Sequence, residues 1–285
     1  MSATTAERVD APGADRPGAA ARRRRPTRRW RSAVNLRGLV FAIGLVLLLE
    51  LLTATVVTSV YVPRPSEIGG ALISELQRGD LMSGIGITLG AYLQGLAIAA
   101  VAGVVLGAGL GASDLAYNTF RILIEFLRPL PSVALIPFSI LLLGVGTTTT
   151  VAMIVFASFW PILFNTYYGV RAVNPVAIES ARIFGLNRRQ VFFRVQIPSA
   201  AVNIAAGIRI SSAIALILVI TVEILTRSGG LGYYIVRMQV AIRTEDMYAG
   251  IFVVGVIGYV VALAVAGLER RVIFWNSDIR EGGDR

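Results

Sequence analysis

The sequence predicts an all-α, polytopic membrane protein with six transmembrane helices and one long polar loop between the fourth and fifth of them. Hydrophobic residues make up 55% of the 285 residues and charged residues only 15%, with a mean hydropathy of +0.70. A soluble domain has about a quarter of its residues charged. Apolar stretches of about 20 residues, the length that crosses a bilayer, recur along the chain, and arginines gather between them.

The charge and the missing residue types narrow the possible functions. The net charge of +10 could indicate a nucleic-acid partner, but the arginines flank the apolar stretches, which is the positive-inside pattern of membrane proteins. We therefore expect no nucleic acid among the partners. The chain contains no Cys and no His, which excludes disulfides, thiolate nucleophiles, histidine bases and zinc sites of the usual kind. No cofactor or metal site is expected in this chain.

The first 36 residues are predicted to form a disordered tail. Residues 1–36 are rich in Arg, Ala, Pro and Gly, a composition that cannot form a packed core. A signal peptide would need a short apolar stretch and then a small-residue cleavage site. The following apolar segment, 39–60, is instead long enough to span the bilayer, so we interpret it as an uncleaved first helix. The tail then helps to fix topology and attracts anionic lipid headgroups.

The rest of the apolar sequence predicts one transmembrane domain, 37–272, followed by a polar tail at 273–285. The further spans are expected at about 84–111, 120–143, 151–168, 200–225 and 248–268. Small residues at spacings of four predict close helix packing in the second span: Gly86, Gly90, Gly103, Gly107 and Gly111. Interior prolines predict that the third span is kinked or broken: Pro129, Pro131 and Pro137.

The connections between the spans predict the topology. Segments 61–83 and 228–247 are expected on the outer side, with Ser66 as the cap of a short amphipathic helix in the first. Six spans put both termini on one side, and the excess of arginines assigns that side to the cytoplasm. The same count places the loop at 171–198 in the cytoplasm.

This loop is predicted to begin with a short helix that has defined ends. Asn174 can cap the helix, and Pro175 suits its first position. Gly185 ends it, because glycine accepts the left-handed backbone that follows a helix. Three apolar residues are expected to form a stripe on one face: Ala177, Ala181 and Phe184.

A second short helix is expected between the first helix and the fifth span. Asn187 can cap it, and the helix is expected to run through Arg194. Pro198 then marks the entry into the fifth span.

The spacing of these loop residues carries a family resemblance. The sequence Glu179-Ser180-Ala181, three residues, Gly185, nine residues and then 195–198 resembles the EAA loop of bacterial ABC importer permeases. That pattern reads Glu-Ala-Ala, three residues, Gly, nine residues and Ile-x-Leu-Pro. The departures, which include Ser180 for Ala, conserve size, and the spacing is kept throughout. The resemblance assigns contact with an ATPase to Glu179, Ser180, Ala181, Arg182, Gly185 and Pro198.

Other motifs resemble the nitrate/sulfonate/taurine-type permeases. These motifs lie at 62–66, 128–131, 159–161 and 230–233. The resemblance implies a transmembrane permease subunit in the bacterial inner membrane, not an enzyme. Two such subunits, usually a homodimer, would form the pathway, while a heterodimer also fits. Two cytoplasmic ABC ATPase subunits would bind ATP and Mg, and an extracytoplasmic binding protein would deliver a small anion or organic acid such as nitrate, a sulfonate, taurine or an aromatic carboxylate.

The role of the 174–185 helix can be stated as two alternatives. In the first, it is a coupling helix that seats in a groove of the ATPase, and Glu179 makes a charge contact there. In the second, Glu179 pairs with Arg182 or Arg188 on its own loop. The chain itself has no phosphate-binding loop of the Gly-x-x-x-x-Gly-Lys-Ser/Thr type, which agrees with ATP being bound by a partner.

Charged residues inside the spans are candidates for the solute pathway or a gate, because such charges are costly in lipid. Glu223 could instead make a structural hydrogen bond. Arg128 and Arg209 could attract an anionic solute, or snorkel or pair, and Glu125 is spaced to pair with Arg128. Glu50 is the candidate in the first span.

Two other functional classes remain as alternatives to an ATP-driven importer. One is a passive channel, in which the basic loop is a solvated connector. The other is a membrane-embedded enzyme, although the sequence lacks the His, Cys or clustered Asp residues that such chemistry would use.

Overall fold

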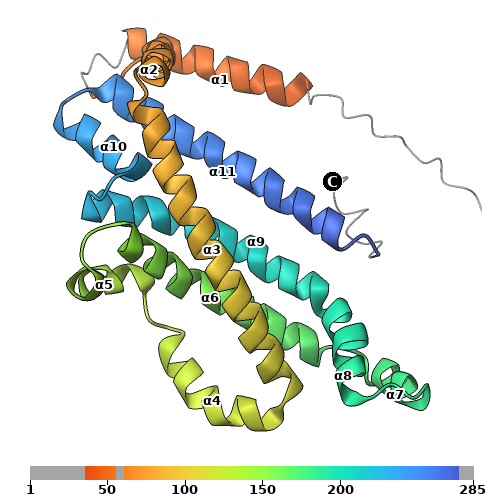
Figure 1. Cartoon of the computed structure of the whole chain (residues 1–285). Coiled ribbons are helices and arrows are strands. Elements are labelled where there is room, and N and C mark those ends of the chain that lie inside the picture. The colour runs from red at the N-terminus through yellow and green to blue at the C-terminus, as the bar shows by residue number, and fades with distance from the viewer. Residues whose placement is uncertain (1–35, 56–60, 276–285) are drawn as a thin grey trace, which may run out of the picture.

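In a computed structural model, the described residues are 36–55 and 61–275, and the regular elements among them are all helical (Figure 1). The predicted tail at 1–36 lies almost entirely outside this part of the chain, as do the last ten residues of the tail at 273–285. The elements are α1 (Leu36–Thr55), α2 (Pro65–Arg78), α3 (Asp80–Ala112), α4 (Asp114–Leu127), η1 (Ser132–Leu135), α5 (Ile136–Leu143), α6 (Thr147–Arg171), α7 (Pro175–Ile183), α8 (Arg188–Val191), the π-helical turn η2 (Phe192–Gln196), α9 (Ile197–Thr226), α10 (Gly230–Val240) and α11 (Thr244–Val272).

The described helices include five that are long and apolar enough to cross a membrane. These are α1, α3, α6, α11 and a continuous stretch from Arg188 to Thr226. A sixth span results if α4 and the η1–α5 segment, which meet at 81°, count as one broken crossing. The predicted fold class is therefore confirmed.

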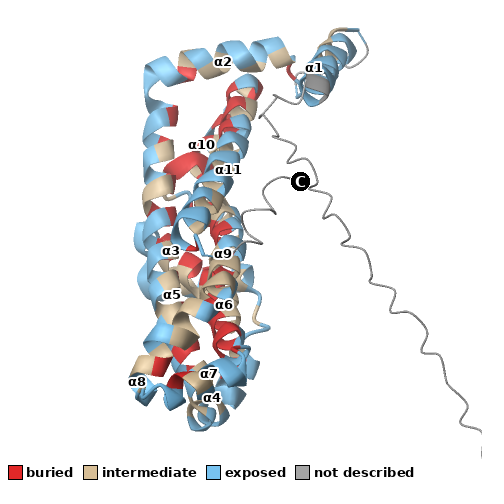
Figure 2. Ribbon diagram, turned by 90° about the vertical axis from the view of Figure 1, so that its right-hand side faces the viewer, coloured by how far each residue is buried: buried red, intermediate tan, exposed pale blue. Residues whose placement is uncertain are grey.

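The centre of the bundle consists of α3, α6 and α9, with α10 packed against α3 and α9. Figure 2 shows that the buried residues concentrate in these helices. Gly107 lets α3 approach α6 closely, since a Cβ there would lie 2.5 Å from the carbonyl oxygen of Leu163. Gly86 and Gly90 have nothing within 4 Å of such an atom. Of the predicted glycines, Gly103, Gly107 and Gly111 therefore lie at close helix contacts, and Gly86 and Gly90 do not.

The break in the third span follows from its prolines. Helix α4 ends at Leu127, and the chain passes through Arg128, Pro129 and Pro131 before η1 begins. Neither proline can donate the backbone hydrogen bond that would continue a helix. Pro137 lies in the first turn of α5, where a missing N–H costs nothing. The break that the sequence predicted near these prolines is therefore present, between two helical segments that meet at 81°.

Helix α1 stands apart from the bundle and reaches it through α2 (Figures 1 and 2). Glu50 accepts hydrogen bonds from the backbone N–H and the hydroxyl of Ser66, at 3.0 and 2.7 Å. The prediction that Ser66 caps α2 is wrong, because the cap is Arg64 and Pro65 opens the helix. Proline's fixed φ favours the first helical position, so the helix starts two residues earlier than expected.

At the end of the bundle that carries α2 and α10, ion pairs tie the elements together. Glu75 is buried and accepts hydrogen bonds from Arg78 and Arg243, each at 2.8 Å. Asp80 pairs with Arg237 at 2.7 Å. These contacts join α2, α3, α10 and the start of α11 into one layer.

Candidate docking loop and intramembrane charges

Helix α7 has the two defined ends that the sequence predicts. The side-chain oxygen of Asn174 accepts a hydrogen bond from the N–H of Val176 at 2.9 Å, and Pro175 occupies the first turn. Gly185 has a φ of +84°, and its N–H donates to the carbonyl of Arg182 at 2.9 Å. The left-handed residue closes the helix and turns the chain away. The helix is therefore a short, stiff unit at one end of the bundle, which we call the loop end.

The second short helix differs from the prediction. Asn187 and Gln190 cap α8 reciprocally, with two hydrogen bonds of 2.9 Å. The helix does not end at Arg194, however, but continues through η2 into α9. A π-helical turn precedes Pro198 and accommodates its missing backbone N–H, which would otherwise interrupt an α-helix. The predicted boundary is wrong, and 188–226 is one continuous helix.

The apolar side chains of α7 divide between two faces. Ala181 is buried against the chain itself, so the predicted stripe with Ala177 and Phe184 does not form one exposed face. Ile183 is 84% and Phe184 is 83% exposed, and Val176 is also exposed. Large apolar side chains gathered at such exposure are a feature of interaction surfaces.

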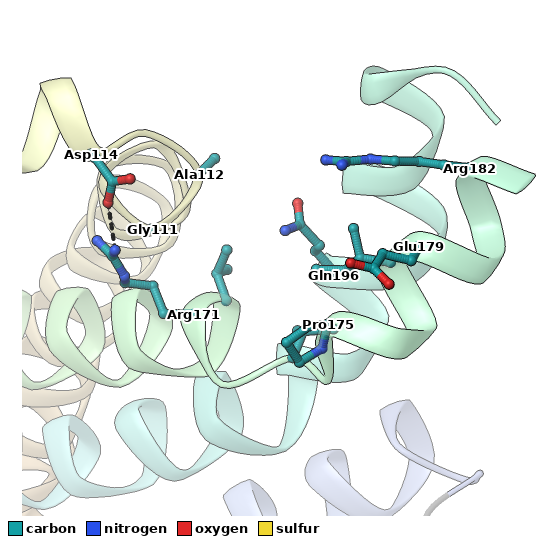
Figure 3. A pocket seen from close by; sticks show the side chains of 11 residues that line it. Gly111, Ala112, Asp114, Arg171, Pro175, Glu179, Arg182 and Gln196 are labelled. Carbon is teal, nitrogen blue, oxygen red and sulfur yellow. Dashed lines mark hydrogen bonds and ion pairs between the residues drawn. The ribbon is translucent and has the colours of Figure 1, made fainter.

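The polar face of α7 borders a cavity of about 320 Å³ (Figure 3). Glu179 and Arg182 line it, together with Gln196 from η2. Across the cavity, Arg171 at the end of α6 pairs with Asp114 at 2.5 Å. In the part of the chain that the structure describes, Glu179 forms no ion pair with Arg182 or with Arg188, so its carboxylate is free to meet another molecule.

Two further residues of the predicted ATPase contact set, Ser180 and Pro198, make contacts within the chain. The backbone carbonyl of Ser180 accepts a hydrogen bond from the N–H of Phe184 at 3.0 Å. Pro198 lines a second, apolar cavity of about 620 Å³ between α3, α9 and α11. Ser180 and Pro198 therefore contribute to the structure of the loop and not to the apolar surface that α7 exposes.

Glu223 is buried in a hydrogen-bond network between three helices. Its carboxylate accepts from the hydroxyl of Thr88 on α3 and from the N–H of Gly232 on α10, the latter at 2.9 Å. The N–H of Leu231 in turn donates to the Thr88 hydroxyl at 2.8 Å. A carboxylate at a helix N-terminus is stabilised by the unpaired N–H groups there. The sequence singled out Glu223 but missed Thr88, which no local pattern marks.

The two arginines inside the spans have different surroundings. Arg209 on α9 forms an ion pair with Glu269 on α11. Arg128 lies at the break after α4, with its guanidinium carbon 4.4 Å from the ring centre of Phe164. The predicted partner Glu125 pairs with Arg121 instead, at 2.7 Å. Sequence spacing allows both pairs, and in the structure Arg128 lies against Phe164 on α6 instead.

Comparison with known proteins identifies the family. Residues 99–274 match the family described as "Binding-protein-dependent transport system inner membrane component". The match covers more than half of the chain. The chain belongs to this family. The protein is thus an ABC transporter permease with membrane-spanning helices, and its homologues are permease subunits rather than enzymes.

Several full-length relatives support this assignment of the permease. A protein of Methanocaldococcus jannaschii named as an ABC transporter permease is 30% identical over 252 residues, which cover 85% of this chain and 94% of that protein. The taurine transport system permease protein TauC of Escherichia coli is 25% identical over 233 residues, with 80% of this chain and 85% of that protein covered. The nitrate/sulfonate/taurine-type resemblance seen in the sequence is therefore confirmed.

A solved structure shares the fold of the permease. A chain of the MetNI methionine ABC transporter, in an inward-facing conformation, superposes with a TM-score of 0.59 at 18% identity. The similarity covers 67% of this chain and 95% of that one. At this identity the comparison supports the fold alone. The family implies that an ATPase partner uses ATP and that a binding protein delivers solute to the permease.

Proposed function

We propose that this permease is one of two identical transmembrane subunits of an ATP-driven importer of a small anion, and that α7 is its coupling helix. Both termini and the loop end lie in the cytoplasm, where two ATPase subunits bind. The binding protein docks at the opposite end, at α2 and α10. The observation that carries the proposal is the exposed apolar end of α7, formed by Ile183 and Phe184, beside the free carboxylate of Glu179.

The continuity of the chain beyond α7 supports a coupling role. The residues from Arg188 to Thr226 form one helix, which runs from the loop end through the bundle to Glu223 and α10. A movement of α7 by the ATPase would therefore reach a membrane span through only the short turn at 184–187. Alternating access needs such a link between two discrete packings of the helices. ATP-driven closure of the ATPase pair opens the pathway outward, and hydrolysis resets it.

The class of solute is proposed from chemistry and from the relatives. TauC is named for taurine, which carries a sulfonate group. Arg128 lies at the break between α4 and η1 without an ionic partner among the described residues, and an uncompensated cation inside a membrane protein favours an anion along the pathway. A small sulfonate, carboxylate or nitrate fits both observations.

The ATPase partner provides the first test. The permease is co-expressed with a candidate ABC ATPase subunit from the same organism and purified through a tag on the permease. We expect the ATPase to copurify, and the variant Ile183→Glu to retain at least tenfold less of it, because a buried charge replaces an apolar anchor. Arg270→Gln, an exposed change in the last turn of α11, is the control and should retain it fully. Copurification that survives both Ile183→Glu and Phe184→Glu would contradict the docking role of α7.

A further inference from the structure

Arg128 lies in an unusual place for a charged residue. It follows the last residue of α4, inside the broken span that α4, η1 and α5 form together (Figure 1). A guanidinium at membrane depth is costly unless it faces protein or a water-filled cavity. The side chain is exposed in the single subunit. The face that carries Arg128 is therefore turned toward a cavity or another subunit rather than toward lipid.

The nearby acidic residues leave Arg128 without an ionic partner. Glu125 pairs with Arg121, and Asp114 pairs with Arg171. Within residues 36–55 and 61–275, no carboxylate lies within ion-pair distance of Arg128. The charge of Arg209, by contrast, is compensated by Glu269. Of these two arginines, only Arg128 has its charge available for a mobile anion.

The guanidinium of Arg128 lies over the ring of Phe164. The guanidinium carbon lies 4.4 Å from the centre of the ring, which is close enough for a cation–π contact. Such stacking occupies a face of the guanidinium and leaves its N–H groups at the edge. Those groups form a planar fork that matches two oxygens of a carboxylate, sulfonate or nitrate. The stack therefore presents a preformed oxyanion contact.

Further aromatic rings extend from this contact along α6. Trp160 and Phe164 stack with centroids 6.4 Å apart, and Phe164 and Tyr168 do so at 6.2 Å. The three residues are spaced by four, so they lie on one face of the helix. A row of ring faces suits the carbon skeleton of an organic anion.

We propose that Arg128, stacked on Phe164, binds the oxyanion group of the solute, and that the rings of Trp160 and Tyr168 line the path of its apolar part. The inference rests on the proposed function, since it names a contact within the pathway of that importer. A lipid phosphate presents the same oxygens to an arginine, so the test separates the two sources.

Fluorescence of Trp160 reports on this contact. The double variant Trp30→Phe/Trp275→Phe leaves Trp160 as the single tryptophan of the chain. The full permease–ATPase complex is purified in a phosphate-free sugar detergent and titrated with ethanesulfonate, propionate or nitrate, with propionamide as the neutral match of propionate. We expect a saturable change in emission with at least one anion and none with propionamide. No saturable response to any of the anions would overturn the proposal.

Two substitutions of Arg128, each made in the Trp30→Phe/Trp275→Phe variant, test whether the anion binds at this residue. Arg128→Gln should weaken the apparent affinity at least tenfold, and Arg128→Lys, which keeps the charge without the fork, should weaken it less. Arg270→Gln, an exposed change in the last turn of α11, should leave it unchanged. Equal affinities in Arg128→Gln and its parent would overturn the proposal. A change in Trp160 emission of the parent with phosphatidylglycerol in mixed micelles, but not with the small anions, would also overturn the proposal.

The same preparations separate this inference from the proposed function. If the ATPase copurifies with the parent and with Arg128→Gln, but both titrate alike, the solute contact is wrong and the importer assignment stands. If no ATPase copurifies with the parent, the importer assignment itself fails.

Discussion

The hydroxyl of Thr88 lies 2.8 Å from a carboxylate oxygen of Glu223, although the two residues are 135 positions apart in the sequence. The pair joins α3 to α9, and both residues also accept a hydrogen bond from the first turn of α10. This network seats α10 against the bundle at the end opposite α7. In this conformation Glu223 makes the hydrogen bonds that one of its two alternatives supposes, and its part in the solute pathway or a gate stays a prediction.

Gly230 is expected to be essential for the packing of α10 against the bundle. A Cβ there would lie 2.2 Å from the carboxyl group of Glu223, and the backbone φ is +84°. We predict that Gly230→Ala lowers the free energy of unfolding by about 2 kcal/mol or more, through overpacking and backbone strain. Thermal unfolding in detergent measures the loss. A melting temperature equal to the parent's would show that α10 is not held by this contact.

Gly107 and Gly86, both on α3, allow a matched comparison of two alanine substitutions. A Cβ at Gly107 would meet the carbonyl oxygen of Leu163 at 2.5 Å, whereas one at Gly86 would meet nothing within 4 Å. Gly107→Ala should destabilise the bundle by about 1–3 kcal/mol. Gly86→Ala should be neutral or slightly stabilising, since alanine favours the helix. Comparable melting temperatures for the two variants would rule out this packing of α3 on α6.

The buried carboxylate of Glu75 predicts a dependence of stability on pH. Burial alone raises the pKa of Glu75, but the hydroxyl of Tyr234 and the guanidinium groups of Arg243 and Arg78 together outweigh it and hold the pKa below its usual 4.5. A lowered pKa in the folded state means that the carboxylate stabilises the protein above pH 4.5 and that this contribution is lost as the pH falls through the folded-state value. Because α2 lies at the rim of the bundle and both arginines are partly exposed, we expect only about 1 kcal/mol.

Glu75→Gln provides the measurement for this prediction. The melting temperature of the variant should be lower than the parent's at pH 7, and the difference should shrink as the pH falls below 4.5. Glu245→Gln, at an exposed position near the same layer, is the control. A difference between Glu75→Gln and the parent that stays constant with pH would show that this carboxylate does not titrate with folding.

Gly185 should affect coupling through the geometry of α7. Its φ of +84° is a backbone conformation that other residues adopt at a cost of about 1–2 kcal/mol. Gly185→Leu is therefore expected to loosen the end of α7, with faster amide hydrogen exchange at 175–186, while the melting temperature of the whole bundle changes little. Exchange that matches the parent's would show that the left-handed turn is not what fixes this helix.

The sequence predicted the features of this fold that depend on local chemistry. Apolar length marks the spans, the prolines near residue 130 mark the broken one, and Asn174 and Gly185 mark the ends of α7. Each of these signals acts within a few residues of where it is read. The same holds for the spacing that indicated the family.

Other features depend on contacts between distant segments. The pairing of Arg209 with Glu269, and of Thr88 with Glu223, arises only when the helices pack. The sequence did not predict that α8 continues into α9, because a proline such as Pro198 normally marks the end of a helix. The π-helical turn before Pro198 lets the helix continue. Sequence periodicity does not tell which of two partners, one three and one four residues away, a charged residue such as Glu125 meets.

ATP-driven uptake in proteoliposomes tests the central proposal most directly. The permease and its ATPase are reconstituted with ATP and Mg inside, and the radiolabelled anion and the binding protein are outside. The proposal predicts accumulation above the outside concentration, at least tenfold reduced in Glu179→Ala, and none without ATP. Entry that stops at equal concentrations and proceeds equally well without the ATPase would contradict it and identify a passive channel.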